Sequence, residues 1–205
     1  MIETQLDPRQ AIVAGLDHWR GSIIYCDDTG LQDQVRDIES ISRMLYSVML
    51  EAVAELDSRN IAGTAGFRNT KQLLAGMLHL SPDEAATRVA HATQLAPRRA
   101  LGGEVLAPLL PHAAAVLAAG EIGPGQVRVI TDTMNAIPAT VNAADRDAAE
   151  ADLARHARSF TLPRYTRSAS TFSRTSTPMV RVPARTRNPI PPPVSCGCAT
   201  AATGG

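Results

Sequence analysis

The sequence contains few aromatic residues, which make up 3% of its 205 positions. Any hydrophobic core must therefore be built from Ala, Leu, Val, Ile and Met. A β-sandwich would require Val, Ile, Tyr and Phe in alternation along its strands. The composition favours packed α-helices instead.

Acidic residues are absent after Asp152. Residues 1–163 hold 14 basic against 20 acidic residues, a net charge of −6, and residues 164–205 hold six Arg and no acid. An acidic body is poorly suited to binding a phosphate backbone. The charge distribution therefore argues against nucleic acid as the main partner.

Cysteine is also scarce, with Cys26 in the body and Cys196 and Cys198 near the C-terminus. This is too few for a disulfide framework, and Cys196-Gly197-Cys198 lacks the usual Cys-x-x-Cys spacing. No signal peptide and no apolar run of about 20 residues, the length of a membrane helix, is visible. We expect a soluble cytoplasmic protein without a membrane partner.

The apolar periodicity predicts helices and no strands. Residues 9–19 suit a short helix ending near Gly21, within an arm of residues 1–33 that is otherwise hard to interpret. Six successive helices are then predicted at about residues 34–57, 69–79, 81–95, 111–120, 124–137 and 142–163. The predicted fold is all-α, with one multi-helix domain over residues 34–163.

The first of these six helices shows one apolar stripe with spacings of three, four or seven residues. We predict that this stripe faces the core; it comprises Val35, Ile38, Leu45, Met49, Ala52 and Leu56.

Three helix starts have clear capping residues, at Asn69, Ser81 and Asn142. Gln72 and Glu84 each follow a cap by three residues, which predicts a capping box at both positions.

The stretch "HLSPDEAATRV" joins two helices in the outline of a helix-turn-helix. A DNA-reading helix contacts bases with its first turn, where this one places Asp83 and Glu84. Because phosphates repel both carboxylates, we interpret the stretch as a packing corner. Leu78, Leu80 and Val89 are expected to turn inward.

Residues 164–205 consist mainly of Arg, Thr, Ser, Ala and Pro, and "NPIPPP" excludes both helix and central strand. We predict a disordered Arg/Pro/Ser/Thr-rich C-terminal tail.

No catalytic, cofactor-binding or metal-binding residue is predicted. The glycine-containing stretches lack the Gly-Lys-Ser/Thr ending of a phosphate loop. The histidines have neither the i, i+4 spacing of a helical metal site nor neighbouring cysteines, and are expected at the surface or its boundary. They are His18, His79, His91, His112 and His156. The acidic side chains of the last helix are expected to form a solvated face; they are Asp145, Asp147, Glu150 and Asp152.

Three motifs in this order and spacing resemble the 13E12 repeat family, whose N-terminal region is the domain of unknown function 222. They are the turn Gly66-Phe67-Arg68, the Leu-Ser-Pro-x-Glu-Ala corner and the Ala-Ala-Gly-Glu-Ile turn of residues 118–122. The resemblance covers about residues 34–163 and is weak over residues 1–33.

The resemblance implies that longer members continue into an HNH nuclease-like region, which nothing in this chain matches. An acidic Leu-Asp-Pro-Asp-Gly segment is expected after residue 163, where this chain has "TSTPMV" at residues 175–180. With suitable codons, that stretch read one nucleotide earlier encodes His-Leu-Asp-Pro-Asp-Gly. Our hypothesis is that a frameshift near Pro163 produced the tail, and the nucleotide sequence would test it.

The predicted function is therefore a non-enzymatic remnant of a longer HNH endonuclease-like protein, with no cofactor and an unidentified partner. Two alternatives stay open. A helical protein-interaction adaptor would require a contiguous exposed apolar patch. A nucleic-acid-binding module would use a basic patch of Arg68, Lys71, Arg88, Arg98 and Arg99.

Overall fold

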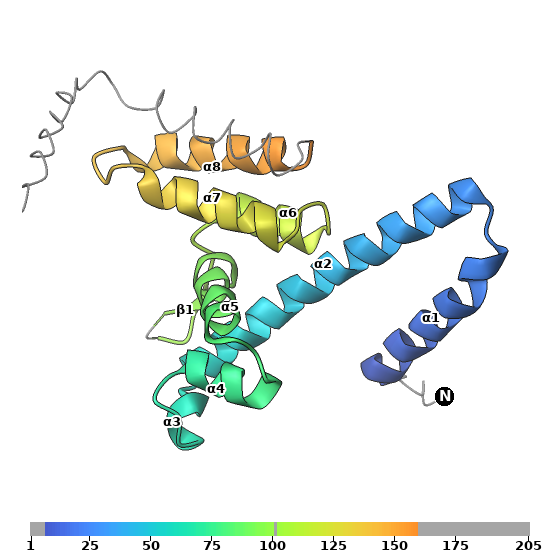
Figure 1. Cartoon of the computed structure of the whole chain (residues 1–205). Coiled ribbons are helices and arrows are strands. Elements are labelled where there is room, and N and C mark those ends of the chain that lie inside the picture. The colour runs from blue at the N-terminus through green and yellow to red at the C-terminus, as the bar shows by residue number, and fades with distance from the viewer. Residues whose placement is uncertain (1–6, 101, 160–205) are drawn as a thin grey trace, which may run out of the picture.

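The computed structural model describes residues 7–100 and 102–159. Within these ranges the protein is all-α, as the sequence predicts, apart from one very short hairpin (Figure 1). The elements are α1 (Pro8–Ser22), the 3₁₀ helix η1 (Ile23–Tyr25), α2 (Asp28–Ser58), α3 (Ile61–Thr64), α4 (Thr70–Leu78), α5 (Pro82–Leu95), β1 (Arg98–Arg99), β2 (Val105–Leu106), α6 (Pro111–Ala118), α7 (Pro124–Ala136) and α8 (Ala143–Ala157). The predicted tail of residues 164–205 lies outside the described residues.

All six predicted helices of the domain are present, and the predicted short helix in the arm is confirmed as α1. Four details differ, the first being that α2 begins at Asp28, six residues before the predicted start at residue 34. The chain forms an antiparallel pair between β1 and β2, whose two-residue strands are too short to give a periodic pattern. The last helix ends at Ala157 rather than near Pro163, and α3 was not predicted.

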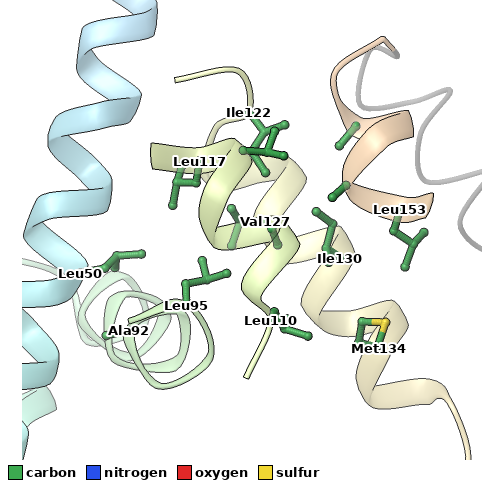
Figure 2. Packing of buried hydrophobic residues seen from close by; sticks show 14 of the residues in the cluster. Leu50, Ala92, Leu95, Leu110, Leu117, Ile122, Val127, Ile130, Met134 and Leu153 are labelled. Atoms are coloured by element: carbon green, nitrogen blue, oxygen red, sulfur yellow. The ribbon is translucent and has the colours of Figure 1, made fainter. Parts of the chain in front are cut away.

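The core lies where the second half of α2 meets α4, α5, α6, α7 and α8 (Figure 1). Its largest fully buried side chains are aliphatic: Leu50, Leu74, Leu117, Ile122, Ile130 and Val127. Figure 2 shows Leu50 of α2 and Leu95 of α5 on one side of α6, with Ile130 of α7 and Leu153 of α8 on the other. The buried apolar residues are Ala, Leu, Val, Ile and Met, which confirms the predicted core composition.

The predicted apolar stripe of α2 is largely wrong. Leu50 and Val53 are the buried residues of this helix, and neither belongs to the stripe. Val35 and Leu45 are 60% and 46% exposed, and Ala52 is exposed as well. The domain packs mainly against a different face of α2, although Met49 and Leu56 of the stripe are partly buried against the core.

The predicted helix caps are confirmed. The side chains of Asn69, Ser81 and Asn142 accept hydrogen bonds from the backbone N–H three residues later, at 2.9, 3.2 and 2.8 Å. Each cap satisfies one of the backbone donors that a helix start leaves without a partner.

The capping-box partners were predicted incorrectly. Gln72 accepts a hydrogen bond from the backbone of Arg68 at 3.3 Å, one residue before the cap. Glu84 accepts from the guanidinium of Arg88 at 2.6 Å. A charged i, i+4 partner on the same helix thus takes the carboxylate that the box would have used.

The helices α1 and α2 form a hairpin that extends away from the core (Figure 1). From here on, the arm means residues 8–48, which include α1 and the first part of α2, rather than the residues 1–33 considered in the sequence. Near its turn, the Gln34 amide donates a hydrogen bond of 2.9 Å to the Ser22 hydroxyl, while the amide oxygen of Gln34 is buried without a partner. No residue of α1 is buried. Among the described helices, none combines the length and the apolar character needed to cross a bilayer.

Candidate functional site

The corner between α4 and α5 has a structural explanation. His79 ends α4 in the left-handed region at φ 54°, and the next backbone N–H, that of Leu80, bonds to the Ala75 carbonyl at 3.2 Å. Leu80 and Val89 are partly buried against the core, as predicted, whereas Leu78 is 41% exposed and was predicted wrongly. The corner therefore directs one face of α5 into the core.

The first turn of α5 presents negative charge. Asp83 and Glu84 are both exposed there. Arg88, one turn later, bonds to Glu84 and also lies 3.2 Å from the sulfur of Met49 on α2. The guanidinium of Arg88 is thus held by its own helix and by α2.

Of the five residues in the predicted basic patch, three have partners within the protein. Arg88 pairs with Glu84. Arg99 pairs with Glu55 of α2 at 3.1 Å, and Arg98 donates to the backbone carbonyl of Ala107 at 3.1 Å.

The other two members of the patch are Arg68, just before α4, and Lys71, in its first turn. Both are exposed, and within residues 7–100 and 102–159 neither forms a salt bridge. In the part of the chain that the structure describes, Arg68 and Lys71 are therefore the two members of the predicted basic patch whose side chains form neither a salt bridge nor a hydrogen bond.

A cavity of about 470 Å³ lies between α2, α5 and the β1–β2 hairpin. Its floor is apolar and includes Val53, Ala92 and Ala96, which are at most 3% exposed. Glu55 and Arg99 belong to its charged wall. A cavity of this size is within the range that small-molecule sites occupy.

Two arginines hold the carboxyl group of Glu55 at this cavity. Hydrogen bonds from Arg59, at 2.6 Å, and from Arg99 lower the pKa of its carboxyl below the ordinary value. A lowered pKa makes this carboxyl group a poorer general acid near neutral pH. Sequence reasoning missed the cavity because its walls come from three separate elements.

A second cluster joins α8 to the start of α6. Glu150 is 2% exposed, so the prediction that it belongs to a solvated face is wrong. Its carboxylate accepts the backbone N–H of Ala113 at 2.9 Å, and His112 lies 3.4 Å from Asp147. Burial raises the pKa of Glu150, and the Ala113 N–H opposes that shift.

Glu150 therefore serves as the N-terminal cap of α6, although it lies on another helix. The first N–H groups of a helix need acceptors, and the positive end of the helix dipole favours a carboxylate. His112, Asp147 and Glu150 place ligand atoms within 4.8 Å of one another. The capping role accounts for the buried carboxylate without a bound ion.

The histidine prediction is wrong for one residue, because His91 of α5 is 3% exposed. Its Nδ1 shares a hydrogen bond of 2.9 Å with the hydroxyl of Tyr46 on α2, and the two rings meet edge to face. Burial lowers the pKa of His91 and raises that of Tyr46. The pair ties α2 to α5 as a neutral contact.

The Ala-Ala-Gly-Glu-Ile turn meets α2 at the base of the arm. Gly120 has φ +75°, and a Cβ placed there would lie 2.4 Å from the Ser40 hydroxyl and 2.7 Å from the Ser40 carbonyl. Arg43 donates to the carbonyl of Glu121 at 2.9 Å. Only glycine allows this approach of two backbones.

The Gly66-Phe67-Arg68 turn has a comparable explanation. Gly66 adopts φ +80°, and the ring of Phe67 approaches Gly76 of α4 to within 3.2 Å of where a Cβ would lie. The motifs that carry the family resemblance therefore occupy positions where the fold restricts the residue type.

Comparison with known proteins supports the family resemblance that these motifs indicate. Residues 32–178 match the domain of unknown function DUF222. The chain is 44% identical over 81 residues to an uncharacterized protein of Mycobacterium tuberculosis, which covers 40% of this chain and 18% of that protein. It is 28% identical over 160 residues to an uncharacterized protein of Mycobacterium bovis, covering 72% of this chain and 34% of the relative.

The alignments thus span less than two thirds of these relatives' own length. No solved structure matches the chain. The family match covers most of the sequence and includes every helix from α4 to α8. The chain belongs to the DUF222 family.

Proposed function

We propose that this domain is a non-catalytic helical scaffold that acts by binding protein through the arm. The observation that carries the proposal is the exposed apolar surface of the arm. Twelve of the 17 large apolar side chains that are exposed among the described residues lie within residues 8–48. They are Ile12, Val13, Leu16, Ile23, Ile24, Tyr25, Leu31, Val35, Ile41, Met44, Leu45 and Val48.

Such a surface needs a partner. Apolar patches of more than a few hundred Å² are rare on monomeric proteins and mark interaction sites. The adaptor alternative requires a contiguous patch of this kind, and we propose that the exposed apolar residues of both helices of the arm form it. The alignment covers only about a third of a longer relative, which suits a scaffold role for this domain. We also propose that this chain is the remnant of a longer HNH endonuclease-like protein. We further propose that it works in the cytoplasm.

Hydroxyl-radical footprinting tests the scaffold proposal, because two methionines provide a matched pair. Met44 in the arm is 38% exposed and Met77 of α4 is 51% exposed. The oxidation of both is measured over a concentration series of the full chain, alone and with the remaining part of a longer relative added. We expect Met44 to become protected while Met77 does not. Equal oxidation of the two in every sample would overturn the proposal.

The non-catalytic part of the proposal needs its own assay. Plasmid and single-stranded DNA are incubated with the full chain and Mg²⁺, Mn²⁺ or Zn²⁺, and no cleavage above the buffer control is expected. Cleavage that is lost in His112→Ala and Asp147→Ala variants would refute this part, because those residues belong to the cluster nearest to a metal site.

The nucleic-acid alternative is tested by gel shift at low and moderate salt. Because Arg88 and Arg99 already have carboxylate partners, we expect no shift. A shift with a steep salt dependence would favour the alternative. In that case the charge reversal of Arg68 and Lys71 should abolish it, whereas reversal of Arg128, 76% exposed on α7, should not.

A further inference from the structure

The cavity between α2, α5 and the β1–β2 hairpin has no part in the proposed scaffold function, which uses the arm. Val53, Ala92 and Ala96 form its buried floor, and Val105 and Leu109, which are 64% and 46% exposed, lie on its hairpin side. Sites for small organic molecules combine an apolar lining of this kind with a few polar groups, in volumes that include the 470 Å³ found here. The lining therefore suits a ligand with an apolar body.

The walls of the cavity are fixed by contacts within the protein. The backbone N–H of Leu110, which follows the hairpin, bonds to the Gln94 carbonyl of α5 at 3.0 Å. Arg99 of β1 bonds to Glu55 of α2 at 3.1 Å. Because the hairpin is tied to both helices, the site is formed before a ligand arrives, which lowers the entropy cost of binding.

One polar side chain of the lining differs from the rest. Six of the seven form hydrogen bonds within the protein: Glu55, Asp57, Ser58, Thr93, Arg98 and Arg99. The seventh, Glu51 of α2, is exposed and has no hydrogen bond or ion pair with any residue that the structure describes. Its carboxylate is therefore the group that remains to bind a polar part of a ligand.

We propose that this cavity binds a small organic cation, whose apolar body lies on the floor and whose single ammonium or guanidinium group pairs with Glu51. The lining carries three carboxylates against two guanidinium groups, so it complements a positive ligand and opposes a negative one. This site goes beyond the proposed scaffold function and does not depend on the arm.

Three probes with the same apolar body and different charge test the proposal: phenylbutylammonium, phenylbutanol and phenylbutyrate. Each is titrated into the full chain with ¹³C-labelled valine methyl groups, and the methyl signals are followed by NMR. Ligands of this size bind with dissociation constants in the millimolar range. We expect saturable shifts at Val53 and Val105 of the cavity, but not at Val35 and Val48 of the exposed arm. Phenylbutylammonium should bind most tightly and phenylbutyrate least tightly.

The role of Glu51 is tested with Glu51→Gln. An exposed ion pair is worth little, so the affinity for phenylbutylammonium should fall by about twofold to fivefold, while that for phenylbutanol stays the same. Asp37→Asn is the matched control, because Asp37 is an exposed acid of the same helix that lies outside the lining and forms no salt bridge with the described residues. It should leave both affinities unchanged.

A second pair of variants tests the location of the site. Thr93→Trp adds a large side chain to the lining and should abolish the shifts at Val53 and Val105. Thr87→Trp is its control on the same helix, outside the lining. Both threonine hydroxyls donate to the carbonyl four residues earlier, at 2.9 and 2.8 Å, so the two variants lose the same kind of bond. Circular dichroism confirms that the helices are retained, and if Thr93→Trp does not fold, the Glu51 variant decides.

The absence of saturable shifts at the cavity valines overturns the proposal, as do equal shifts at the arm valines. Phenylbutyrate that binds as tightly as phenylbutylammonium refutes the cationic class of ligand, and so does an equal loss of affinity in Glu51→Gln and Asp37→Asn. None of these results bears on the footprinting of Met44, so the scaffold function stands or falls separately.

Discussion

The substitution Gly120→Ala tests whether the Ala-Ala-Gly-Glu-Ile turn requires glycine because it docks on α2. Two separate costs follow from the structure. The backbone at Gly120 has φ +75°, a region that costs an L-residue about 1–2 kcal/mol. The added methyl group would also lie 2.4 and 2.7 Å from Ser40 atoms, one of which is a backbone carbonyl that cannot rotate away.

The second cost follows from overpacking. Extra methyl groups in a well-packed site typically cost about 1–3 kcal/mol, because neighbouring elements must move. Here the movement would separate the turn from α2 and strain the hydrogen bond from Arg43 to the Glu121 carbonyl. We therefore expect Gly120→Ala to lower the free energy of unfolding by about 2–5 kcal/mol.

Gly103→Ala provides the matched control. Gly103 has φ +86°, and a Cβ there would meet no atom within 4 Å. It should lose only the backbone contribution, about 1–2 kcal/mol. Gly66, at φ +80° and equally open, gives a second control with the same expected loss.

Urea titration followed by circular dichroism at 222 nm measures all three variants. The difference between Gly120→Ala and the two controls isolates the contact with α2, and it should be about 1–3 kcal/mol. If Gly120→Ala is no less stable than Gly103→Ala, the turn does not lie against α2 as described and the reasoning is refuted.

Three further predictions concern caps and buried polar groups, each measured by urea unfolding. Glu150→Ala should cost about 1–3 kcal/mol, because it leaves the Ala113 N–H buried without an acceptor. Glu150→Gln keeps an acceptor and should cost less; equal losses would contradict the capping role. Since burial raises the pKa of Glu150, its contribution is present below pH 4.5, the ordinary value, and is lost as pH rises through the folded-state pKa, so the stability of the wild type relative to Glu150→Gln should fall over that window. His91 acts in the opposite direction: its pKa is lowered, so its contribution is present above pH 6.5 and is lost as pH falls below that value, and a His91→Gln variant should not show this loss. Asn142→Ala should cost about 1 kcal/mol through the lost cap of α8, and no measurable loss would show that this cap is dispensable.

Local sequence signals predicted the features that local physics controls. The caps at Asn69, Ser81 and Asn142 were identified correctly, because a cap bonds to a backbone N–H only three residues away. The aliphatic core follows from composition, since the sequence offers few aromatic residues. The order of six helices follows from periodicity and from Pro and Gly at their ends.

The α2 stripe shows where periodicity becomes ambiguous. A long helix can carry apolar residues on more than one face, and spacing alone does not show which face meets the core. The core takes Leu50 and Val53, whereas Val35 and Leu45 of the predicted stripe remain exposed.

The candidate-site residues were hardest to predict because their partners are distant in sequence. The sequence predicts Glu150 to be a solvated acid. In the structure its carboxylate accepts the backbone N–H of Ala113 on α6, which lies 37 residues away in the chain. His91 meets Tyr46 across 45 residues, and Arg99 meets Glu55 across 44. None of these pairs leaves a pattern in the sequence.

The sequence by itself determined that this protein is helical, where most of its helices begin, and that its core is aliphatic, because those properties depend on residues within one or two turns of each other. Only the tertiary structure decided which face of α2 is buried, which acid caps α6 and which cations of the predicted basic patch have a partner. Those outcomes depend on how separate helices pack, and packing brings together groups that the chain order keeps apart.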